Sequence, residues 1–230
     1  MLIRTVQETG STNEDLLAEA RAGAPEGTWL RAETQSGGRG RVGRNWISPP
    51  GNLYASTIVR LHPGEPEPAT LALVAAVALE ELASAYAGPG RLQLKWPNDL
   101  MAGPAKLAGI LLERADDAVV IGFGLNLAHH PENLERPTAS FASLGLAVPD
   151  PGGFAADLVD ALARWVARWR SEALAPVRAR WLERAHPIGS ALSANGVEGL
   201  FEGLDGQGAL LLRRADGIVE TIRAGDVFLA

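Results

Sequence analysis

The pattern of hydrophobic and polar positions predicts a chain that mixes β-strands and α-helices. Short runs that alternate, or that are wholly apolar, favour strands at residues 2–7, 28–33, 52–60, 91–95, 106–113 and 118–125. Apolar positions at helical spacing predict helices at residues 11–23, 69–86, 154–172 and 175–184. The helix at 69–86 is almost entirely apolar, so we expect it to be buried against the sheet. The strands at 106–113 and 118–125 are predicted to form a hairpin.

The pattern changes after His186-Pro187, where we predict a domain boundary. Residues 188–230 contain five short strand-like pieces separated by glycines, and Asp205-Gly206 and Asp216-Gly217 are strong signals for hairpin turns. Several short strands in so few residues favour a small closed or nearly closed β-barrel. We therefore expect a large domain over residues 1–185 and a small β domain over residues 186–230.

A cluster of glycines and arginines is the feature that points most directly to a function. It reads Gly37-Gly38-Arg39-Gly40-Arg41-Val42-Gly43-Arg44, in a chain whose formal net charge is -6. A tight cationic cluster in an acidic protein indicates a specific anionic ligand. The glycines allow backbone N–H groups to approach a ligand, and arginine forks match carboxylate and phosphate oxygens. Trp46 follows at once and offers a flat face on which a base can stack.

Three common motifs explain this cluster less well. Residues 38–43 match the G-x-G-x-x-G pattern of dinucleotide-binding folds, but Pro49-Pro50-Gly51 follows where that fold requires a helix. A phosphate-binding P-loop needs a Gly-Lys-Ser or Gly-Lys-Thr, and the chain contains neither. Arginine-glycine tracts that bind RNA are repeated within disordered tails, whereas this cluster occurs once, between two predicted strands.

Three other short stretches carry candidate chemistry. Ser11 to Glu14 fits a helix capping box, and the free N–H groups of such a helix start also bind anions or carbonyl groups. The stretch Lys95-Trp96-Pro97-Asn98-Asp99 places opposite charges beside a rigid turn, although Asn98-Asp99 is also ordinary turn chemistry. Lys106 begins an apolar strand, where it is either a solvated edge residue or a single buried ammonium that points into a pocket.

The composition argues against several classes of protein. The chain has no cysteine, and its four histidines lack metal-ligand spacing, so we expect no metal held by the protein itself. The N-terminus lacks the apolar core of a signal peptide, and the longest apolar run, residues 69–79, is too short to span a bilayer. The acidic pI of about 5.3 disfavours nucleic-acid binding. We expect a soluble, cytoplasmic protein with no membrane or nucleic-acid partner.

Taken together, the motifs resemble those of the biotin protein ligases. The resemblance rests on Ser11-Thr12-Asn13, residues 35–46, Lys95 to Asp99, Lys106-Leu107-Ala108-Gly109-Ile110 and Gly122-Phe123-Gly124-Leu125-Asn126. Residues 203–210 are similar to the SH3-like end domain of that family, so the resemblance covers nearly the whole chain. It implies the α/β (α+β) fold shared with class II aminoacyl-tRNA synthetases and lipoate ligases. That fold has a mixed β-sheet with flanking helices, followed here by a small C-terminal SH3-like β-barrel.

The resemblance also implies a reaction in two steps. Biotin attacks ATP to give biotinyl-5′-adenylate and pyrophosphate, with Mg²⁺ accompanying the ATP. The adenylate then acylates one lysine of a biotin carboxyl carrier protein, such as a subunit of acetyl-CoA carboxylase. Joining a carboxylate to a triphosphate requires fixed positive charge where the two anions meet.

The family resemblance assigns roles to individual residues. The expected biotin-binding residues are Ser11, Thr12, Asn13, Gln35, Gly38, Arg39, Gly40, Arg41, Lys106 and Gly109. The expected nucleotide-binding residues are Arg39, Arg41, Arg44, Trp46, Asn98, Lys106 and Asn126, with Trp46 stacked on adenine. The expected catalytic residues are Lys106, Arg41 and Asp99. The role of Asp99 is a hypothesis that rests on its position as a carboxylate beside a rigid turn: it orients or deprotonates the incoming lysine.

Two alternative functions stay open. A lipoate or octanoyl ligase of the same fold lacks such a glycine-arginine loop, and a non-catalytic biotin-sensing regulator does not need Lys106, Arg44 or Trp46. Many family members carry an N-terminal DNA-binding domain, whereas this chain begins at the predicted catalytic domain, so we expect no repressor function. Val42 stands where some members have another arginine. A free sheet edge would permit a homodimer, and a monomer is equally compatible with the sequence.

Overall fold

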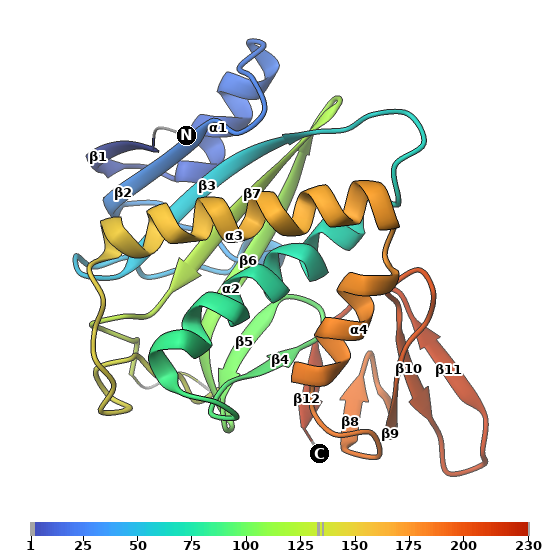
Figure 1. The fold of residues 1–230 in the computed structure, drawn as a ribbon. Helices are drawn as coiled ribbons and strands as arrows, with labels where there is room; N and C mark the ends of the chain where they lie inside the picture. Colours follow the sequence, from blue (N-terminus) through green and yellow to red (C-terminus); the bar gives the residue numbers. More distant parts are fainter. Residues whose placement is uncertain (1–2, 133, 135, 230) are drawn as a thin grey trace.

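The computed structural model describes residues 3–132, 134 and 136–229, and its main element is a seven-stranded mixed sheet (Figure 1). Its strands are β1 (Ile3–Thr9), β2 (Trp29–Gln35), β3 (Leu53–Arg60), β4 (Gln93–Lys95), β5 (Asp99–Ala102), β6 (Ala105–Ala115) and β7 (Ala118–Leu125). They lie in the order β1-β2-β3-β7-β6-β5-β4. The pair β1 and β2 is parallel, and every other neighbouring pair is antiparallel.

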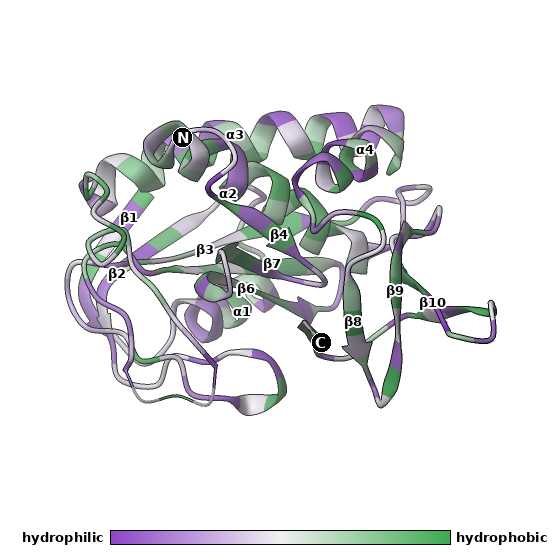
Figure 2. Cartoon of the chain, turned by 90° about the horizontal axis from the view of Figure 1, so that it is seen from below, coloured by the Kyte–Doolittle hydropathy of each residue, from purple (hydrophilic) through white to green (hydrophobic). Residues whose placement is uncertain are grey.

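Helices cover the two faces of this sheet unequally. Helices α2 (Leu71–Ala87) and α3 (Pro151–Glu172) lie together over one face, and α1 (Thr12–Arg21) lies on the opposite face (Figures 1 and 2). Because α1 has only ten residues, it covers part of its face. The remainder of that face becomes the wall of a cavity.

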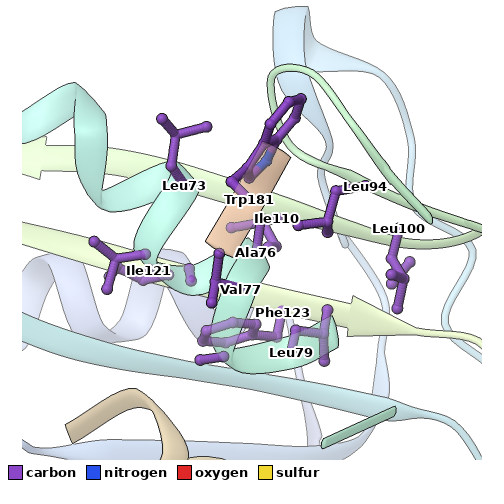
Figure 3. Packing of buried hydrophobic residues seen from close by; sticks show 14 of the residues in the cluster. Leu73, Ala76, Val77, Leu79, Leu94, Leu100, Ile110, Ile121, Phe123 and Trp181 are labelled. Atoms are coloured by element: carbon purple, nitrogen blue, oxygen red, sulfur yellow. The ribbon is translucent and has the colours of Figure 1, made fainter. Parts of the chain in front are cut away.

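The alternation of side chains along each strand divides them between these two faces. On β3, Ala55 and Val59 belong to the large core under α2 and α3, whereas Ile58 packs with α1. Figure 3 shows part of the large core, to which Val77 and Leu79 of α2 and Phe123 of β7 belong. Ser56 of β3 is on the α1 side and is fully buried, so a polar group lies beneath the cavity.

Helix α2 is apolar over most of its surface and lies between two layers, the sheet and α3. The segment Pro68–Ala87 is long and apolar enough to cross a membrane, but 61% of its most apolar window is buried within the protein. That burial is typical of a core helix, and the expectation of no membrane partner stays a prediction. The helix ends at Gly88, whose φ of 86° favours glycine.

The predicted elements are present with shifted boundaries, and one strand was not predicted. Strand β5 has four residues and follows the turn at Pro97 directly, so it is too short to show a period of its own. Helix α3 begins at Pro151, earlier than predicted, because the Asp150 carboxylate accepts the Gly153 N–H at 2.7 Å and caps it. Leu2 and Ala230, the outer bounds of two predicted segments, lie outside the described residues.

The C-terminal part forms a second sheet, which follows α4 (Ala175–Arg184). Its strands are β8 (Ala191–Ala194), β9 (Val197–Leu204), β10 (Leu210–Arg213), β11 (Val219–Ile222) and β12 (Val227–Leu229). They are antiparallel in the order β11-β10-β9-β8-β12, and the two predicted hairpin turns join β9 to β10 and β10 to β11. Closure of this sheet into a barrel stays a prediction, as does the boundary at residues 185 and 186.

The second sheet packs closely against the rest of the protein. Phe201 meets Trp181 of α4 edge to face, with 6.4 Å between ring centroids. The Trp96 indole N–H donates to the Gly208 carbonyl at 3.0 Å. This hydrogen bond ties the β4–β5 turn to the C-terminal sheet. Asp226 and Val227, at the start of β12, line the cavity.

Candidate active site

The uncovered part of the sheet forms a cavity of about 640 Å³, which is a suitable size for a small organic ligand. Its lining comes from the start of α1, the loop after β2, the β4–β5 turn, strands β6 and β7, the loop after β7 and the start of β12. With the exception of Gly38, every residue assigned a role from the sequence lines this cavity. Gly38 is buried behind it, where a Cβ atom would lie 2.5 Å from the Trp46 carbonyl oxygen.

Glycines form the floor of the cavity. Gly109 of β6 and Gly124 of β7 are register partners on the cavity face, and the Trp46 ring fills the space above them. A Cβ atom on Gly124 would lie 2.5 Å from the indole. The indole N–H is buried without a partner, and the Lys106 ammonium lies 5.5 Å from the ring centroid. The aromatic face predicted to receive a base is therefore inside the cavity.

The glycine-arginine loop folds back on itself as a short antiparallel excursion. Arg39 and Asn45 form an isolated bridge, and the Trp46 N–H donates to the Gly38 carbonyl at 2.9 Å. A 3-10 turn, Arg41–Gly43, forms the tip, where Val42 has a φ of 57° and an 86% exposed side chain. A β-branched residue in the left-handed region is strained, so the tip of the loop is its least favourable point.

The arginines of the loop form ion pairs with carboxylates of the protein itself. Arg39 forms an ion pair with Glu14 of α1. Arg44 forms one with Asp226, just before β12, and Arg41 lies 3.7 Å from the same carboxylate. Arg41 also donates to Asn98 at 3.2 Å and to the Gly225 carbonyl at 3.0 Å. These cations therefore ring the cavity with their charges already paired.

Asp226 is the centre of this cationic cluster. Besides the two loop arginines, Arg136 lies 3.5 Å from its carboxylate. The hydrogen bond from Arg44 lowers the pKa of Asp226 below its ordinary value, and the charges of Arg44, Arg136 and Arg41 act in the same direction. The Asp226 carboxylate therefore occupies a position in which an anionic group of a ligand would contact the same three arginines.

A second charge cluster lies at the β4–β5 turn. The Lys106 ammonium lies 2.6 Å from one oxygen of Asp99, and the Lys95 ammonium lies 3.6 Å from the other. Burial lowers the pKa of Lys95, against the opposing effect of Asp99. The sequence left Lys106 as either a solvated edge residue or a buried ammonium that points into a pocket. Its side chain lines the cavity and is 29% exposed, whereas that of Lys95 is 10% exposed. The buried cation is therefore Lys95, and Lys106 faces the cavity.

Lys95 and Lys106 are also the two lysines of the whole chain, against nineteen arginines. Arginine otherwise supplies all the fixed side-chain cations, so both lysines stand where a compact ammonium contacts the same carboxylate. Lysine provides a point charge with rotatable donors, and arginine a planar fork. This count is a further sequence signal, beside the charge pair with Asp99, that marks Lys95 as a site residue.

The start of α1 forms the opposite end of the cavity. Ser11 stands at the N-cap position but makes no side-chain cap hydrogen bond, and Glu14 pairs with Arg39, so the predicted capping box is wrong. Gln35 instead accepts the Thr12 backbone N–H at 2.9 Å. The N-terminus of the helix is thus held by a residue of β2, and its side chains are turned to the cavity wall.

The remaining polar residues of the lining are anchored by backbone groups. Asn98 donates to the Ile110 carbonyl at 2.6 Å and accepts from Arg41. Asn126 donates to the Ala139 carbonyl at 3.0 Å and is 2% exposed. Their predicted contacts with a nucleotide stay predictions. Asp226 and Arg136 are site residues that were not predicted, since nothing near them in sequence marks them as partners of the loop. Lys95 was predicted only as the charged partner of Asp99 in the Lys95–Asp99 stretch, without a binding or catalytic role of its own.

Because His186 is buried beside Lys95, we expect the protein to lose stability in mild acid. Burial lowers the pKa of His186, and the nearby Lys95 charge lowers it further. The unfolded chain therefore binds this proton at a higher pH, so the contribution of neutral His186 is kept above about pH 6.5 and lost as the pH falls. In urea titrations at pH 7.5 and 5.5, His186→Gln is expected to lose less stability on acidification than the wild type. The exposed control His129→Gln should behave as wild type; an equal loss in all three proteins would contradict the assignment.

Comparisons with known proteins agree with this geometry. Residues 6–126 match the model of the biotin/lipoate A/B protein ligase family, and residues 192–230 match that of the biotin protein ligase C terminal domain. A relative from Paracoccus denitrificans, named biotin--[acetyl-CoA-carboxylase] ligase, is 38% identical, and the match covers 96% of this chain and 97% of the relative. A relative of the same name from Mycobacterium tuberculosis is also 38% identical, over 96% of this chain and 86% of its own length.

Solved structures give the same fold. The biotin protein ligase from Aquifex aeolicus in complex with biotin and ATP superimposes with a TM-score of 0.88, covering 99% of both chains at 24% identity. That identity supports the fold alone, whereas the full-length identity to the two bacterial relatives supports descent from the same ancestor. The chain belongs to the biotin protein ligase family.

Proposed function

We propose that this protein is an ATP-dependent, AMP-forming ligase that activates biotin as biotinyl-5′-adenylate and transfers it to a lysine of a carboxylase carrier domain. The observation that carries the proposal is the convergence of all the sequence motifs on one cavity. That cavity has a polar end at α1, an aromatic ring in its middle and two cationic clusters at its other end. This arrangement suits an elongated ligand with a polar ring and an acid group.

The first step requires the biotin carboxylate to attack the α-phosphorus of ATP and release pyrophosphate. Positive charge is needed where the two anions meet, and it must be in place before the reaction. Lys106 supplies it from β6 and Arg41 from the loop. The ring of biotin lies at the end formed by Ser11, Thr12, Asn13 and Gln35, and adenine stacks on Trp46 near Asn98 and Asn126.

The ion pairs of the loop change partners when the ligands bind. The phosphate of the adenylate takes the place of Asp226 beside Arg41 and Arg44, and the loop moves over the cavity. Val42 at its strained tip favours such movement, because leaving the left-handed region relieves the strain. Arg39 and Gly40 then enclose the carboxyl group, and the closed loop shields the reactive mixed anhydride from water.

In the second step, the biotinyl group is transferred from the adenylate to a lysine of the carrier. An incoming lysine amine attacks the biotinyl carbonyl carbon, and AMP leaves with the bonding electrons. Asp99 lies beside Lys106, where it orients the amine or accepts its proton. The acceptor is a biotin carboxyl carrier protein, such as a subunit of acetyl-CoA carboxylase, in agreement with the names of the two bacterial relatives.

Magnesium would accompany ATP in this reaction, and the described residues provide few ligands for it. Among the described residues, no group of three or more His, Cys, Asp or Glu side chains could hold a metal ion. The carboxylates that line the described part of the cavity, Asp99 and Asp226, are both held by cations. An ion that arrives with ATP would keep water and phosphate oxygens as most of its ligands.

The alternatives differ in ligand and in partner. The first matched model covers both biotin and lipoate ligases, but the second is that of the biotin protein ligase C terminal domain. A non-catalytic regulator would have no use for Lys106 at the cavity wall. We further propose a cytoplasmic protein that binds neither nucleic acid nor membrane. The free edge of β1 permits a homodimer.

The deciding experiment measures both steps. Purified protein is incubated with ATP, Mg²⁺ and labelled biotin, and we expect an acid-labile adenylate and biotin-dependent exchange of pyrophosphate into ATP. Addition of a carrier domain should give a labelled lysine. Lipoic acid serves as the competing substrate. Exchange with lipoic acid and none with biotin would overturn the proposal in favour of the first alternative.

Arg41→Ala is expected to slow adenylation about 100-fold, near the lower end of the loss caused by removing one charge-stabilising donor. The reason is its position: it is the loop arginine that reaches Asn98 at the β4–β5 turn. Pyrophosphate exchange measures the effect. Arg168→Ala, an exposed arginine of α3 that pairs with Glu172, is the matched control. A rate within threefold of wild type would exclude a catalytic role for Arg41.

Gly124→Ala is expected to raise the KM for ATP about tenfold, equivalent to roughly 1.4 kcal/mol of binding. The added methyl would lie 2.5 Å from the Trp46 indole, so the ring must leave its place. Gly206→Ala is the control, because nothing lies within 4 Å of a Cβ atom there. Unchanged KM values for both ATP and biotin would show that the position of Trp46 is irrelevant to binding.

A further inference from the structure

A chain of buried hydrogen bonds lies under the α1 end of the cavity. It runs from Glu113 of β6 through Asn13 of α1 and Ser56 of β3 to Thr12. Three of these residues are at most 4% exposed, and Glu113 is half-buried. Neither Ser56 nor Glu113 was expected to take part in the site. In a buried chain of this kind, the direction of each proton is fixed by groups that can only accept or only donate.

Glu113 sets the direction of the first bond. Its carboxylate only accepts, so the amide nitrogen of Asn13 must face it, at 2.8 Å. The amide oxygen of Asn13 then faces Ser56. Gly122 is required for this arrangement, because a Cβ atom at that position would collide with the Asn13 amide. Both amide protons of Asn13 are thus used within the protein, since the nitrogen also donates to the Leu111 carbonyl at 3.4 Å.

Ser56 passes the direction on. An amide oxygen only accepts, so the single hydroxyl proton of Ser56 goes to Asn13, at 2.6 Å. The 2.7 Å contact between the Ser56 and Thr12 hydroxyls must then use the proton of Thr12. Thr12 therefore has no proton left for the Gln35 side-chain oxygen, 3.1 Å away. Its oxygen keeps a free lone pair.

The same accounting applies to Gln35. Its amide nitrogen donates to the Ser48 hydroxyl at 3.1 Å, so its oxygen is the atom that faces Thr12. This oxygen accepts the Thr12 backbone N–H and retains a second lone pair. Both Thr12 and Gln35 line the cavity. The α1 end of the cavity thus presents acceptors, and it is matched to a ligand ring that carries N–H donors.

We infer that Glu113 and Ser56 are positioning residues that act through Asn13 to hold Thr12 as an acceptor for a ring N–H of the ligand. The inference rests on the proposed function, in which that ring is the ureido ring of biotin. A ring without N–H groups, such as the dithiolane of lipoic acid, would leave both acceptors without partners, and buried polar groups without partners reject such an analogue strongly.

The test uses variants that separate hydrogen-bond direction from charge and from shape. Glu113→Gln retains an acceptor oxygen for Asn13, whereas Glu113→Leu has none. Ser56→Ala removes the central hydroxyl. Thr57→Ala is the matched control, because Thr57 is the next residue on β3, is also buried, and points to the opposite face. The KM values for biotin and ATP and the kcat are measured by pyrophosphate exchange for each protein.

We expect the KM for biotin to rise about tenfold in Glu113→Leu and Ser56→Ala, with the KM for ATP and the kcat within twofold of wild type. Glu113→Gln and Thr57→Ala should match wild type. Desthiobiotin, which keeps both ureido N–H groups, should show the same tenfold loss.

If Glu113→Gln raised the KM for biotin as far as Glu113→Leu, charge would be responsible and the inference would be wrong. An unchanged KM for biotin in Glu113→Leu would also overturn it while leaving the proposed function intact. Absence of biotin-dependent exchange in the wild type would overturn both.

Discussion

Lys106→Ala is expected to slow biotin adenylation roughly 100- to 1,000-fold while the fold is retained. The ammonium lies at the cavity wall, 2.6 Å from Asp99 and above the Trp46 ring, where the carboxylate and the α-phosphate must meet. No other lysine can replace it, because Lys95 is buried on the other side of the same carboxylate. Biotin-dependent pyrophosphate exchange measures the loss, and thermal unfolding measures the fold.

Lys106→Arg adds a sharper comparison. If only positive charge at this position mattered, arginine would restore most of the adenylation rate that alanine loses. We expect less than a tenth of wild-type activity, because a planar guanidinium does not fit the space between Asp99 and the Trp46 ring. Arg164→Ala, which removes an exposed cation of α3, is the control. Full turnover in Lys106→Ala would refute the proposed chemistry.

Much of the fold could be predicted because its signals are local. The helix over 71–87 is almost entirely apolar and ends at a glycine, and strands β6 and β7 are long apolar runs joined by a tight turn. The hairpin turns of the second sheet are marked by Asp-Gly pairs. Strand β5 was not predicted because four residues after a proline show no period, and its strand character comes from pairing with β4 and β6.

The site residues that belong to a sequence motif could be predicted. The prediction missed features of the site that depend on contacts between segments far apart in the sequence. Lys95 is buried because its edge strand lies beside His186 and Val227 of the C-terminal part, which no local pattern reveals. Asp226 is an ordinary acid before a three-residue strand, and only the fold brings it to Arg44. The predicted cap at Ser11 failed for the same reason, since Arg39 takes the carboxylate of Glu14.

Asp99→Asn is expected to slow the transfer of biotin from preformed adenylate to a carrier lysine roughly 100- to 10,000-fold, the range of general base catalysis. The side chain keeps its shape, but it no longer accepts a proton or holds two ammonium groups. Adenylation should fall less, because Lys106 keeps its charge. Single-turnover mixing of isolated adenylate with the carrier domain separates this step from the first one.

The pH dependence of transfer distinguishes a base from a positioning group. Without Asp99, the incoming amine must lose its proton to solvent, and a free lysine has a pKa of about 10.4. The transfer rate of Asp99→Asn should therefore rise close to tenfold per pH unit between pH 7 and 9, whereas the wild type should change much less. Asp157→Asn, an exposed acid of α3, is the control and should follow the wild type. A variant that transfers biotin at an unimpaired rate would remove Asp99 from the mechanism. A slow variant with a flat pH profile would assign it to holding Lys106 and Lys95 in place, because proton removal would then not limit the rate.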